Sequence, residues 1–365
     1  MKTINVGLIG IGTWAQYGVI PILNLLPQFR LLAIQSRSLN KAQNFAQGHK
    51  VPFYYDDEDK LLRNDKIDLI MVTTPAPTHF QYARKAILAG KNVYTEWPLT
   101  TNKTQSQELV DLAQENHVRT FVGFQRRYSP SARFFKDFLD QKRIGKIRSA
   151  RVSIGVEAFA RVMPENYEWT TKSENYTDVL TVDVGHFADL LFHLVGQPNL
   201  VIGLTANQFK QTTLFDKKNR TKKVPYGLPN NVTVMGTLLE SQQLFVINAE
   251  GAQDNISGMQ LEVTGNDGVL MLTNTRAYQN EADNKLLLLD KNHDTFTRLT
   301  IPGKYDTLPK NDLDNSVQDA GYYYQAIAGD LMNDKHTTPS FETAVQMHEF
   351  ISKIIDSNKK LREGE

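Results

Sequence analysis

The chain has 365 residues, of which 41% are hydrophobic and 22% charged, with a formal net charge of +1. This length exceeds what one hydrophobic core usually serves, so we expect two domains. The near-neutral charge gives no indication of a nucleic-acid or anionic-membrane partner. The absence of cysteine excludes disulfides, thiolate catalysis and cysteine-ligated metal or iron–sulfur sites.

The first expected strand begins by residue 4, which leaves no room for a signal peptide. No apolar run approaches the roughly 18 residues that a membrane span needs. We therefore expect a cytoplasmic protein with a small-molecule substrate and no membrane partner.

The segment INVGLIGIGTWA, residues 4–15, reads as a buried strand, a glycine turn and the start of a helix. Gly10, Gly12 and Ala15 match the dinucleotide fingerprint G-x-G-x-x-G/A in that context. Gly10 permits the tight turn, Gly12 leaves space for the pyrophosphate, and Ala15 lets the helix pack close to the strand. Thr13 and Trp14 complete the loop, where free N–H groups at the helix start meet the phosphates. The alternative is an ordinary strand-to-helix turn.

Up to residue 125, short apolar strands alternate with helices, which predicts a parallel Rossmann sheet covered on both faces. We expect Pro21 to interrupt the first helix with a kink or a frayed turn. The expected strands are 4–9, 30–35, 67–73, 91–95 and 119–123, and the expected helices are 15–26, 39–47, 79–89 and 102–116.

Residues 126–365 are expected to form an α+β domain for substrate binding and oligomerisation, with a large, mainly antiparallel open sheet. The helix near 341–362 has the length to pack back near the N-terminal domain. An open sheet face needs a cover, which favours a homo-oligomer, either a dimer or a tetramer. The expected strands are 145–158, 232–239, 242–250, 259–265 and 268–274, the other helices are 178–195 and 316–333, and 206–230 and 302–315 are expected to be surface loops.

The second strand ends in a stretch without the carboxylate that usually binds the ribose 2′-hydroxyl of NAD. Ser36 offers a hydroxyl and Arg37 a guanidinium for a 2′-phosphate, and Lys41 adds a second charge one turn later. These residues predict NADP(H), with NAD(H) as the alternative. Arg37 could equally be a solvated loop residue.

Further motifs make the chain recognisable. The stretch TTPAPTHFQYARKAILAGKNVYTEWPLT, residues 73–100, resembles a segment of the glucose–fructose oxidoreductase/inositol dehydrogenase family, and 122–130, 144–149 and the helix end 189–196 continue the likeness. The resemblance implies a two-domain, nicotinamide-dependent oxidoreductase acting mostly on sugars, polyols or their derivatives. The sequence E-W-P-L resembles the branch that includes the yeast galactose-regulon repressor, which binds NADP and regulates.

The resemblance also implies site residues. Thr74, Pro75, His79, Glu96 and Pro98 would contact or lie near the cofactor, and His79 could equally be structural. The peptide bond before Pro98 would be cis.

The family's catalytic lysine and its D-x-x-x-H motif are altered in this chain. Trp97 stands at the lysine position and cannot hold a proton or act through charge. His186 precedes Asp189 by three residues, as in the family, and is the best candidate for proton transfer. The position four residues before His186 is Val182, and helical geometry would aim the adjacent Asp183 elsewhere. A structural role for His186 is the alternative.

Trp97 could stack on a sugar or line the substrate pocket. We expect no metal site, because the nearby carboxylates and histidines lack ligand spacing. The remaining pocket candidates, on weaker grounds, are Arg126, Arg127, Tyr128, Tyr167 and Trp169, whereas His193 is expected to pack in the core.

Two functions from different classes follow. We favour an NADP(H)-dependent oxidoreductase on a sugar, polyol or small carbonyl compound, in which His186 transfers the proton and Trp97 shapes the pocket. The alternative is a catalytically silent NADP-binding sensor that acts through a protein partner. The missing lysine favours the sensor, and the retained histidine favours the enzyme.

Overall fold

The computed structural model describes residues 3–159, 161–239, 242–253, 257–278 and 282–364. The chain forms two compact units. The first comprises Met1–Gln125 and Leu308–Gln346, and the second comprises Arg126–Thr307 and Met347–Glu365. The expected boundary at residue 125 coincides with the first break between the units. Residues 308–346, however, belong to the first unit and not to the expected second domain.

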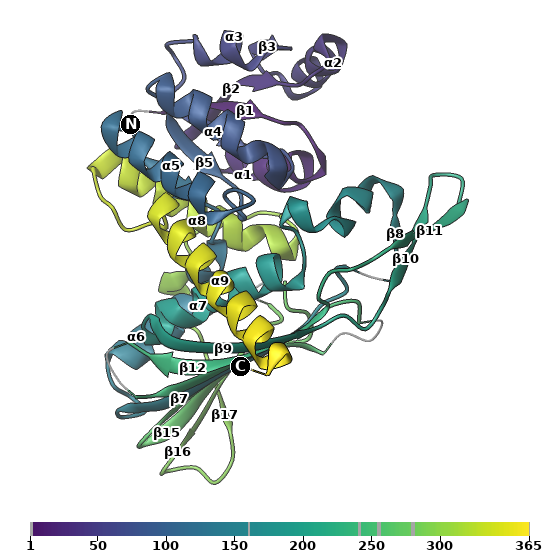
Figure 1. Cartoon of the computed structure of the whole chain (residues 1–365). Helices are drawn as coiled ribbons and strands as arrows, with labels where there is room; N and C mark the ends of the chain where they lie inside the picture. Colours follow the sequence, from purple (N-terminus) through teal and green to yellow (C-terminus); the bar gives the residue numbers. More distant parts are fainter. Residues whose placement is uncertain (1–2, 160, 240–241, 254–256, 279–281, 365) are drawn as a thin grey trace. The chain divides into compact units, whose positions relative to one another are not determined.

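The first unit is built on a six-stranded parallel sheet with the strand order β3-β2-β1-β4-β5-β6. This order and the helices on both faces confirm the Rossmann-type parallel sheet. The strands are β1 (Ile4–Ile9), β2 (Phe29–Gln35), β3 (Phe53–Tyr55), β4 (Leu69–Val72), β5 (Asn92–Thr95) and β6 (Thr120–Val122). The helices before residue 125 are α1 (Ile20–Leu25), α2 (Leu39–His49), α3 (Glu58–Leu62), α4 (His79–Leu88) and α5 (Lys103–Glu115). Contacts join α3 to α4 and α4 to α5 on one side of the sheet, and α1 to α8 (Asn315–Asn333) elsewhere (Figure 1).

The first helix begins at Thr13 and includes a π-helical segment, η1 (Ala15–Val19), immediately before α1. Pro21 has no N–H to donate and its ring crowds the carbonyl of the preceding turn. The wider π-turn ahead of Pro21 accommodates this conflict, so the helix continues through the proline.

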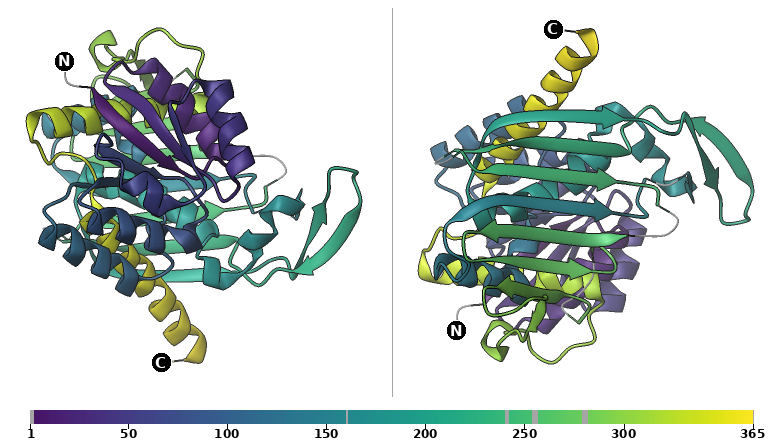
Figure 2. Two further views of the ribbon diagram at one scale, coloured as in Figure 1. Left: turned by 90° about the horizontal axis from the view of Figure 1, so that it is seen from above. Right: turned by 90° about the horizontal axis from the view of Figure 1, so that it is seen from below.

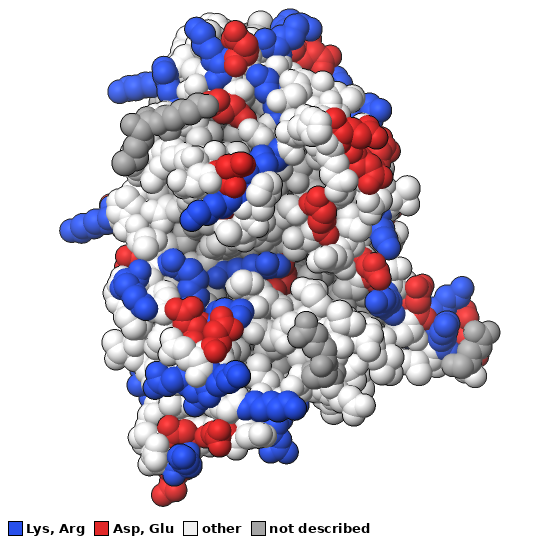
Figure 3. All heavy atoms as spheres, turned by 90° about the vertical axis from the view of Figure 1, so that its left-hand side faces the viewer, with Lys and Arg blue, Asp and Glu red and all other residues white. Residues whose placement is uncertain are grey.

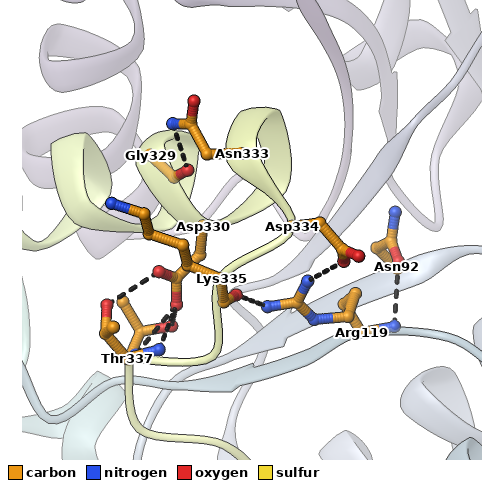
Figure 4. A network of polar contacts seen from close by, with 9 residues as sticks. Asn92, Arg119, Gly329, Asp330, Asn333, Asp334, Lys335 and Thr337 are labelled. Carbon is orange, nitrogen blue, oxygen red and sulfur yellow. Dashed lines mark hydrogen bonds and ion pairs between the residues drawn. The ribbon is translucent and has the colours of Figure 1, made fainter.

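Polar contacts attach the returning segment to the first unit. Arg119, just before β6, donates a hydrogen bond to the Lys335 carbonyl and contacts Asp334 at 3.3 Å (Figure 4). Asp330 accepts four hydrogen bonds of 2.7–2.9 Å from the backbones and hydroxyls of Thr337 and Thr338. Burial alone would raise the pKa of Asp330, but these hydrogen bonds outweigh it and lower the pKa. This carboxylate therefore fixes the turn between α8 and α9 (Phe341–Glu363).

The second unit contains an eight-stranded mixed sheet with the order β17-β16-β15-β14-β7-β13-β12-β9. Only the pairing of β7 with β13 is parallel among these described strands. The strands are β7 (Ile147–Gly155), β9 (Pro198–Ala206), β12 (Asn231–Leu238), β13 (Leu244–Glu250), β14 (Gly258–Gly265), β15 (Gly268–Asn274), β16 (Lys285–Asp290) and β17 (Thr297–Leu299). Buried and exposed residues alternate along β12 and β13, as expected when one face of a sheet packs on a core.

Helices cover one face of this sheet and leave the other open (Figure 2, right). The covering elements include α6 (Pro130–Asp140), the π-helical η6 (Val179–Val184) and α7 (Gly185–Val195), which contact β7, β12, β13 or β15. Phe192 of α7, Phe245 of β13 and Phe350 of α9 meet in edge-to-face or tilted contacts, with ring centroids 5.0–6.4 Å apart. These aromatic contacts form the core beneath the sheet.

The expectation of a surface loop over 206–230 is wrong. This stretch contains β10 (Gln211–Phe215) and β11 (Thr221–Pro225), which pair antiparallel, and β10 pairs in parallel with β8 (Val162–Pro164). Threonine and lysine begin β11, which has little buried surface, so the sequence lacks the apolar pattern that predicts a strand. This three-stranded sheet projects from one side of the second unit (Figures 1 and 2).

The short 3₁₀ segments are η2 (Ala76–Thr78), η3 (Gln125–Tyr128), η4 (Glu165–Thr171), η5 (Ser173–Asn175) and η7 (Gly303–Tyr305). On the face shown in Figure 3, basic and acidic side chains are interspersed. None of the described helices combines the length and apolar character that a membrane span requires.

Candidate functional site

The first unit brings the carboxyl ends of its parallel strands to one edge, where the fingerprint loop follows β1. Gly10 has a φ of +93°, and a Cβ there would lie 2.7 Å from Thr74 Cγ2. Its backbone is joined to both neighbouring strands, since Gly10 N–H donates to the Gln35 carbonyl at 3.2 Å and Thr73 Oγ1 donates to the Gly10 carbonyl at 2.8 Å. The tight turn therefore requires glycine at position 10.

Gly12 has different surroundings. A Cβ at this residue would meet nothing within 4 Å, and both Gly12 and Thr13 are exposed. The helix begins directly after Gly12, which has no side chain to cap the first N–H groups. Open space in front of an uncapped helix N-terminus fits the pyrophosphate of a dinucleotide.

The loop after β5 is hydrogen-bonded to the fingerprint helix. Trp14 Nε1 donates to Glu96 Oε1 at 2.7 Å, and Tyr94 Oη donates to the same oxygen at 2.9 Å. A Cβ on Gly123, which follows β6, would lie 2.8 Å from the other Glu96 oxygen. Burial raises the pKa of Glu96 to about 7, although the two donors act to lower it. Glu96 therefore links the ends of β5 and β6 to the helix that follows Gly12.

His79 connects two neighbouring loops. Its Nδ1 lies 2.8 Å from the Pro98 carbonyl oxygen and its Nε2 lies 2.6 Å from the Thr74 carbonyl oxygen. Only 2% of His79 is exposed, and burial lowers its pKa more than the two carbonyl contacts raise it. This placement positions the ends of β4 and β5 rather than presenting the imidazole to a ligand. The Trp97–Pro98 peptide bond is cis, as the resemblance implies.

Trp97, at the position of the family's lysine, is 5% exposed and packs on Phe124 with ring centroids 4.8 Å apart. Its ring therefore has little free surface in this structure. Ser36 is half-buried, whereas Arg37 and Lys41 are exposed beyond the carboxyl end of β2. Pro75 is also exposed, and Ala15 is fully buried against the sheet.

In the second unit, Asp183 and His186 lie where η6 passes into α7, and Tyr278 contacts both. Tyr278 Oη donates to Asp183 Oδ1 at 2.7 Å, and the Tyr278 and His186 rings meet edge to face with centroids 6.1 Å apart. The Arg126 guanidinium carbon lies 4.5 Å from the centroid of the Tyr278 ring. We call these four residues the Asp183 cluster.

Burial dominates the electrostatics of this cluster. It raises the pKa of Asp183 to about 7, against the lowering effects of the Tyr278 hydrogen bond and the Arg126 charge. Burial and the Arg126 charge lower the pKa of His186 to about 3, so the imidazole is neutral at pH 7. Burial also raises the pKa of Tyr278 well above its ordinary value, so the phenol keeps its proton. The cluster thus holds one carboxyl group that titrates near neutral pH.

Some buried polar atoms near this cluster lack a protein partner among the described residues. They include Asp183 Oδ2 and Tyr226 Oη. Tyr226 is close enough to Asp183 for that carboxylate to raise the pKa of the phenol. Buried polar atoms are rarely left unpaired, so these acceptors and donors suit a ligand rich in hydroxyl groups.

The other predicted pocket residues have separate surroundings. Arg127 forms a two-pronged ion pair with the buried Asp189, with its Nε 2.7 Å from Oδ2, and so neutralises a carboxylate beneath the sheet. Tyr167 and Trp169 lie in η4, which packs on β8 and β10. Tyr128 is half-buried at the end of η3, and burial lowers the pKa of His193 to about 4. The described residues contain no group of three histidine or acidic side chains that could hold a metal ion.

Sequence reasoning missed Tyr278 and Tyr226. Both lie outside the strands, in segments without a motif, and both are distant from Asp183 in the chain. The sequence contains no local signal that would have identified them.

Comparison with known proteins agrees with this two-part arrangement. Residues 4–124 match the model of an oxidoreductase family with an NAD-binding Rossmann fold, and residues 130–274 match the C-terminal domain of Gal80p. An oxidoreductase of Formosa agariphila is 31% identical over 196 residues, which are 53% of this chain and 61% of that relative. The chain thus spans about three fifths of that relative's length.

Two solved structures share the fold over nearly the whole chain. A levoglucosan dehydrogenase in complex with NADH and levoglucosan has a TM-score of 0.85 at 17% identity, covering 98% of both chains. A super-repressor mutant of Gal80p from Saccharomyces cerevisiae has a TM-score of 0.84 at 18% identity, covering 98% of this chain and 96% of the other. Residues 4–124 therefore form the Rossmann domain of an oxidoreductase family with an NAD-binding fold, and residues 130–274 form a domain similar to the C-terminal domain of Gal80p.

Proposed function

We propose that the protein is an NADP(H)-dependent oxidoreductase that transfers hydride between the nicotinamide and a sugar, polyol or small carbonyl compound. The observation that carries this proposal is the open space at Gly12 in front of an uncapped helix N-terminus. The hydrogen bonds between Glu96, Trp14 and Tyr94 support it, because they order the same edge of the sheet. The unpartnered polar atoms near Asp183 favour a substrate with several hydroxyl groups.

The choice of NADP(H) rests on Arg37. Its guanidinium is exposed beyond the end of β2, where a ribose 2′-phosphate binds in Rossmann folds, and Lys41 follows within one helical turn. Ser38 caps that helix and accepts from the Lys41 N–H at 3.4 Å, and the Lys41 residue is exposed. The levoglucosan dehydrogenase structure contains NADH, so NAD(H) is the competing cofactor.

The test is a titration of NADPH and NADH against the wild type and Arg37→Ala. Removing a charge-assisted hydrogen bond costs about 1.5–3 kcal/mol, so we expect NADPH affinity to fall roughly 10–100-fold while NADH affinity stays unchanged. Arg30→Ala is the matched control, because Arg30 is an exposed arginine at the amino end of the same strand. Tighter binding of NADH than NADPH by the wild type would overturn the cofactor assignment.

Catalysis would draw on the second unit. When bound, the nicotinamide supplies the hydride acceptor or donor. We propose that His186, as a neutral imidazole, hydrogen-bonds the reacting hydroxyl and orients it, and that Asp183 belongs to the same site. Trp97 would limit the volume beside the cofactor through its packing on Phe124.

We also propose that the open sheet face is covered by a second copy of the chain. Its apolar residues lie on neighbouring strands: the exposed Ile202 pairs with the exposed Met235, and Met235 pairs with the half-buried Val246. Met235 is 52% exposed and Leu244 is 60% exposed. An apolar stripe on an open sheet is typical of an interface between subunits.

A regulatory function is the second candidate, because Trp97 replaces the family's lysine and residues 130–274 match Gal80p. Such a protein would bind NADP and a protein partner without turnover. Pull-down from cells with and without NADP distinguishes the two functions, since a regulator would capture a partner in a cofactor-dependent manner.

A further inference from the structure

Tyr278 is the one member of the Asp183 cluster that is only half-buried, and its hydroxyl group contacts the buried carboxyl group. Asp183 is 1% exposed and His186 is 7% exposed, whereas Tyr278 is half-buried. The carboxyl oxygen that Tyr278 does not contact, Asp183 Oδ2, is fully enclosed. Tyr278 Oη contacts the other carboxyl oxygen, Asp183 Oδ1, at 2.7 Å.

Trp97 stands where the resemblance implies a catalytic lysine, and His186 cannot act in its place as a proton store. Its neutral form predominates throughout the physiological range, because burial and Arg126 lower the pKa of the imidazole. The carboxyl group of Asp183 is the remaining buried group of the cluster that can gain and lose a proton near neutrality. The groups that face it are Tyr278, Asp178, Arg126 and Tyr226.

We propose that Tyr278 and Asp183 form a proton relay that takes over the acid–base function of the missing lysine, a role that rests on the proposed oxidoreductase function. In alcohol oxidation, the substrate O–H gives its proton to Tyr278 Oη while the phenol O–H proton passes to Asp183 Oδ1. The C–H bond breaks at the same carbon, and its electron pair leaves with the hydrogen as hydride to the oxidised nicotinamide cofactor. The carbonyl forms, and Tyr278 ends as a neutral phenol. Carbonyl reduction runs these transfers in reverse.

This relay avoids a free phenolate. Burial and the adjacent Asp183 carboxylate raise the pKa of Tyr278 and so disfavour its ionised form, although Arg126 opposes this effect. In a concerted transfer, the negative charge is on the Asp183 carboxylate before the reaction, and both Asp183 and Tyr278 are neutral after it. The existing hydrogen bond of 2.7 Å already has the direction that oxidation needs, with the phenol donating and the carboxylate accepting.

The experiment compares the wild type with Tyr278→Phe, Asp183→Asn and Tyr305→Phe in steady-state oxidation of a polyol that the wild type accepts. Tyr305 is the matched control, because it donates to Asp137 Oδ2 at 2.5 Å in the same unit but outside the cluster. We expect Tyr278→Phe and Asp183→Asn to lower kcat by ~10²–10⁴-fold, with NADP affinity unchanged and KM within about threefold. The amide oxygen introduced by Asp183→Asn can still accept the Tyr278 hydrogen bond, so a purely structural role predicts that this variant keeps its kcat.

The pH profile is the second readout. Oxidation needs the Asp183 carboxylate, so kcat/KM should rise with pH through the Asp183 pKa of about 7 and then level off, whereas reduction should decline above about 7. In Asp183→Asn, the rise of kcat/KM with pH should disappear. Carboxyl-carbon NMR of the wild type should show an aspartate that titrates in the same pH range. In Tyr278→Phe that aspartate should titrate at higher pH, because a donor to its charged form is gone.

Retention of wild-type kcat in Tyr278→Phe, or of the rise of kcat/KM with pH in Asp183→Asn, would overturn the relay and leave the oxidoreductase function standing. If the wild type binds NADP but oxidises none of the polyols, the proposed function fails and the relay fails with it. These outcomes separate the two proposals.

Discussion

Gly10 and Gly12 are two residues apart in the fingerprint loop, yet the physical reasons for glycine differ. Gly10 has a φ of +93°, and a Cβ added there would lie 2.7 Å from Thr74 Cγ2, so the fold itself requires glycine. Gly12 borders open space, so the fold itself does not require glycine there, and we propose that the approach of the cofactor phosphates does. The distinction between folding and binding is visible here at single positions.

These surroundings predict opposite behaviour for two variants. Gly10→Ala should lose about 1–3 kcal/mol of unfolding free energy, because the side chain is strained and meets Thr74. Gly12→Val should stay within about 0.5 kcal/mol of the wild type and lose at least ~10-fold in NADPH affinity. Urea denaturation and a binding titration on both proteins check this. A Gly12→Val protein that binds NADPH normally would show that the phosphates do not approach Gly12.

At the same scale, sequence and structure diverge most at Asp183. Helical spacing from His186 directs attention away from this residue, since the family pattern places the aspartate at position 182. The structure places Asp183 in a π-helical segment and in contact with Tyr278, 95 residues later in the chain. Neither the π-turn nor the distant tyrosine has a local sequence signal, whereas the glycine fingerprint is local and was predictable.

Among the elements, the long apolar strands and amphipathic helices followed from periodicity, and the polar ones did not. β1, β2 and β4 are continuous apolar runs between helices, which is the pattern of a buried parallel sheet. β10 and β11 are rich in threonine and lysine and pair with each other; β10 buries only Thr212 and Leu214, and β11 has little buried surface, so neither has the apolar pattern of a core strand. The helix pair that ends the chain was predicted, and the last helix was expected to pack back near the N-terminal domain; the placement of α8 in the first unit was not predicted.

The open sheet gives a prediction at the scale of elements. Met235→Lys should dissociate the homo-oligomer, because a charge would be buried among Ile202 and Val246 of the proposed interface. Leu88→Lys is the control, since Leu88 is 51% exposed on α4 and Met235 is 52% exposed on β12. Light scattering after size exclusion measures the mass of each protein. A wild-type protein that is monomeric at micromolar concentration would contradict the proposed interface.

For the whole molecule, the domain matches show a Rossmann domain of an oxidoreductase family followed by a domain similar to the C-terminal domain of Gal80p. The family alone does not decide between enzyme and regulator, because relatives of both kinds share this fold. The decision rests on whether the second unit can move a proton without the lysine. The raised pKa of Asp183 and its bond to Tyr278 favour the enzyme.

The most direct measurement of that central claim follows the hydride itself. The wild type would be incubated with NADPH deuterated at the transferring position of nicotinamide C4 and a panel of keto-sugars, ketopolyols and small carbonyl compounds. The enzyme function predicts that at least one product carries deuterium on its new carbinol carbon. Tight NADPH binding without deuterium in any product would contradict catalysis and support the regulatory function.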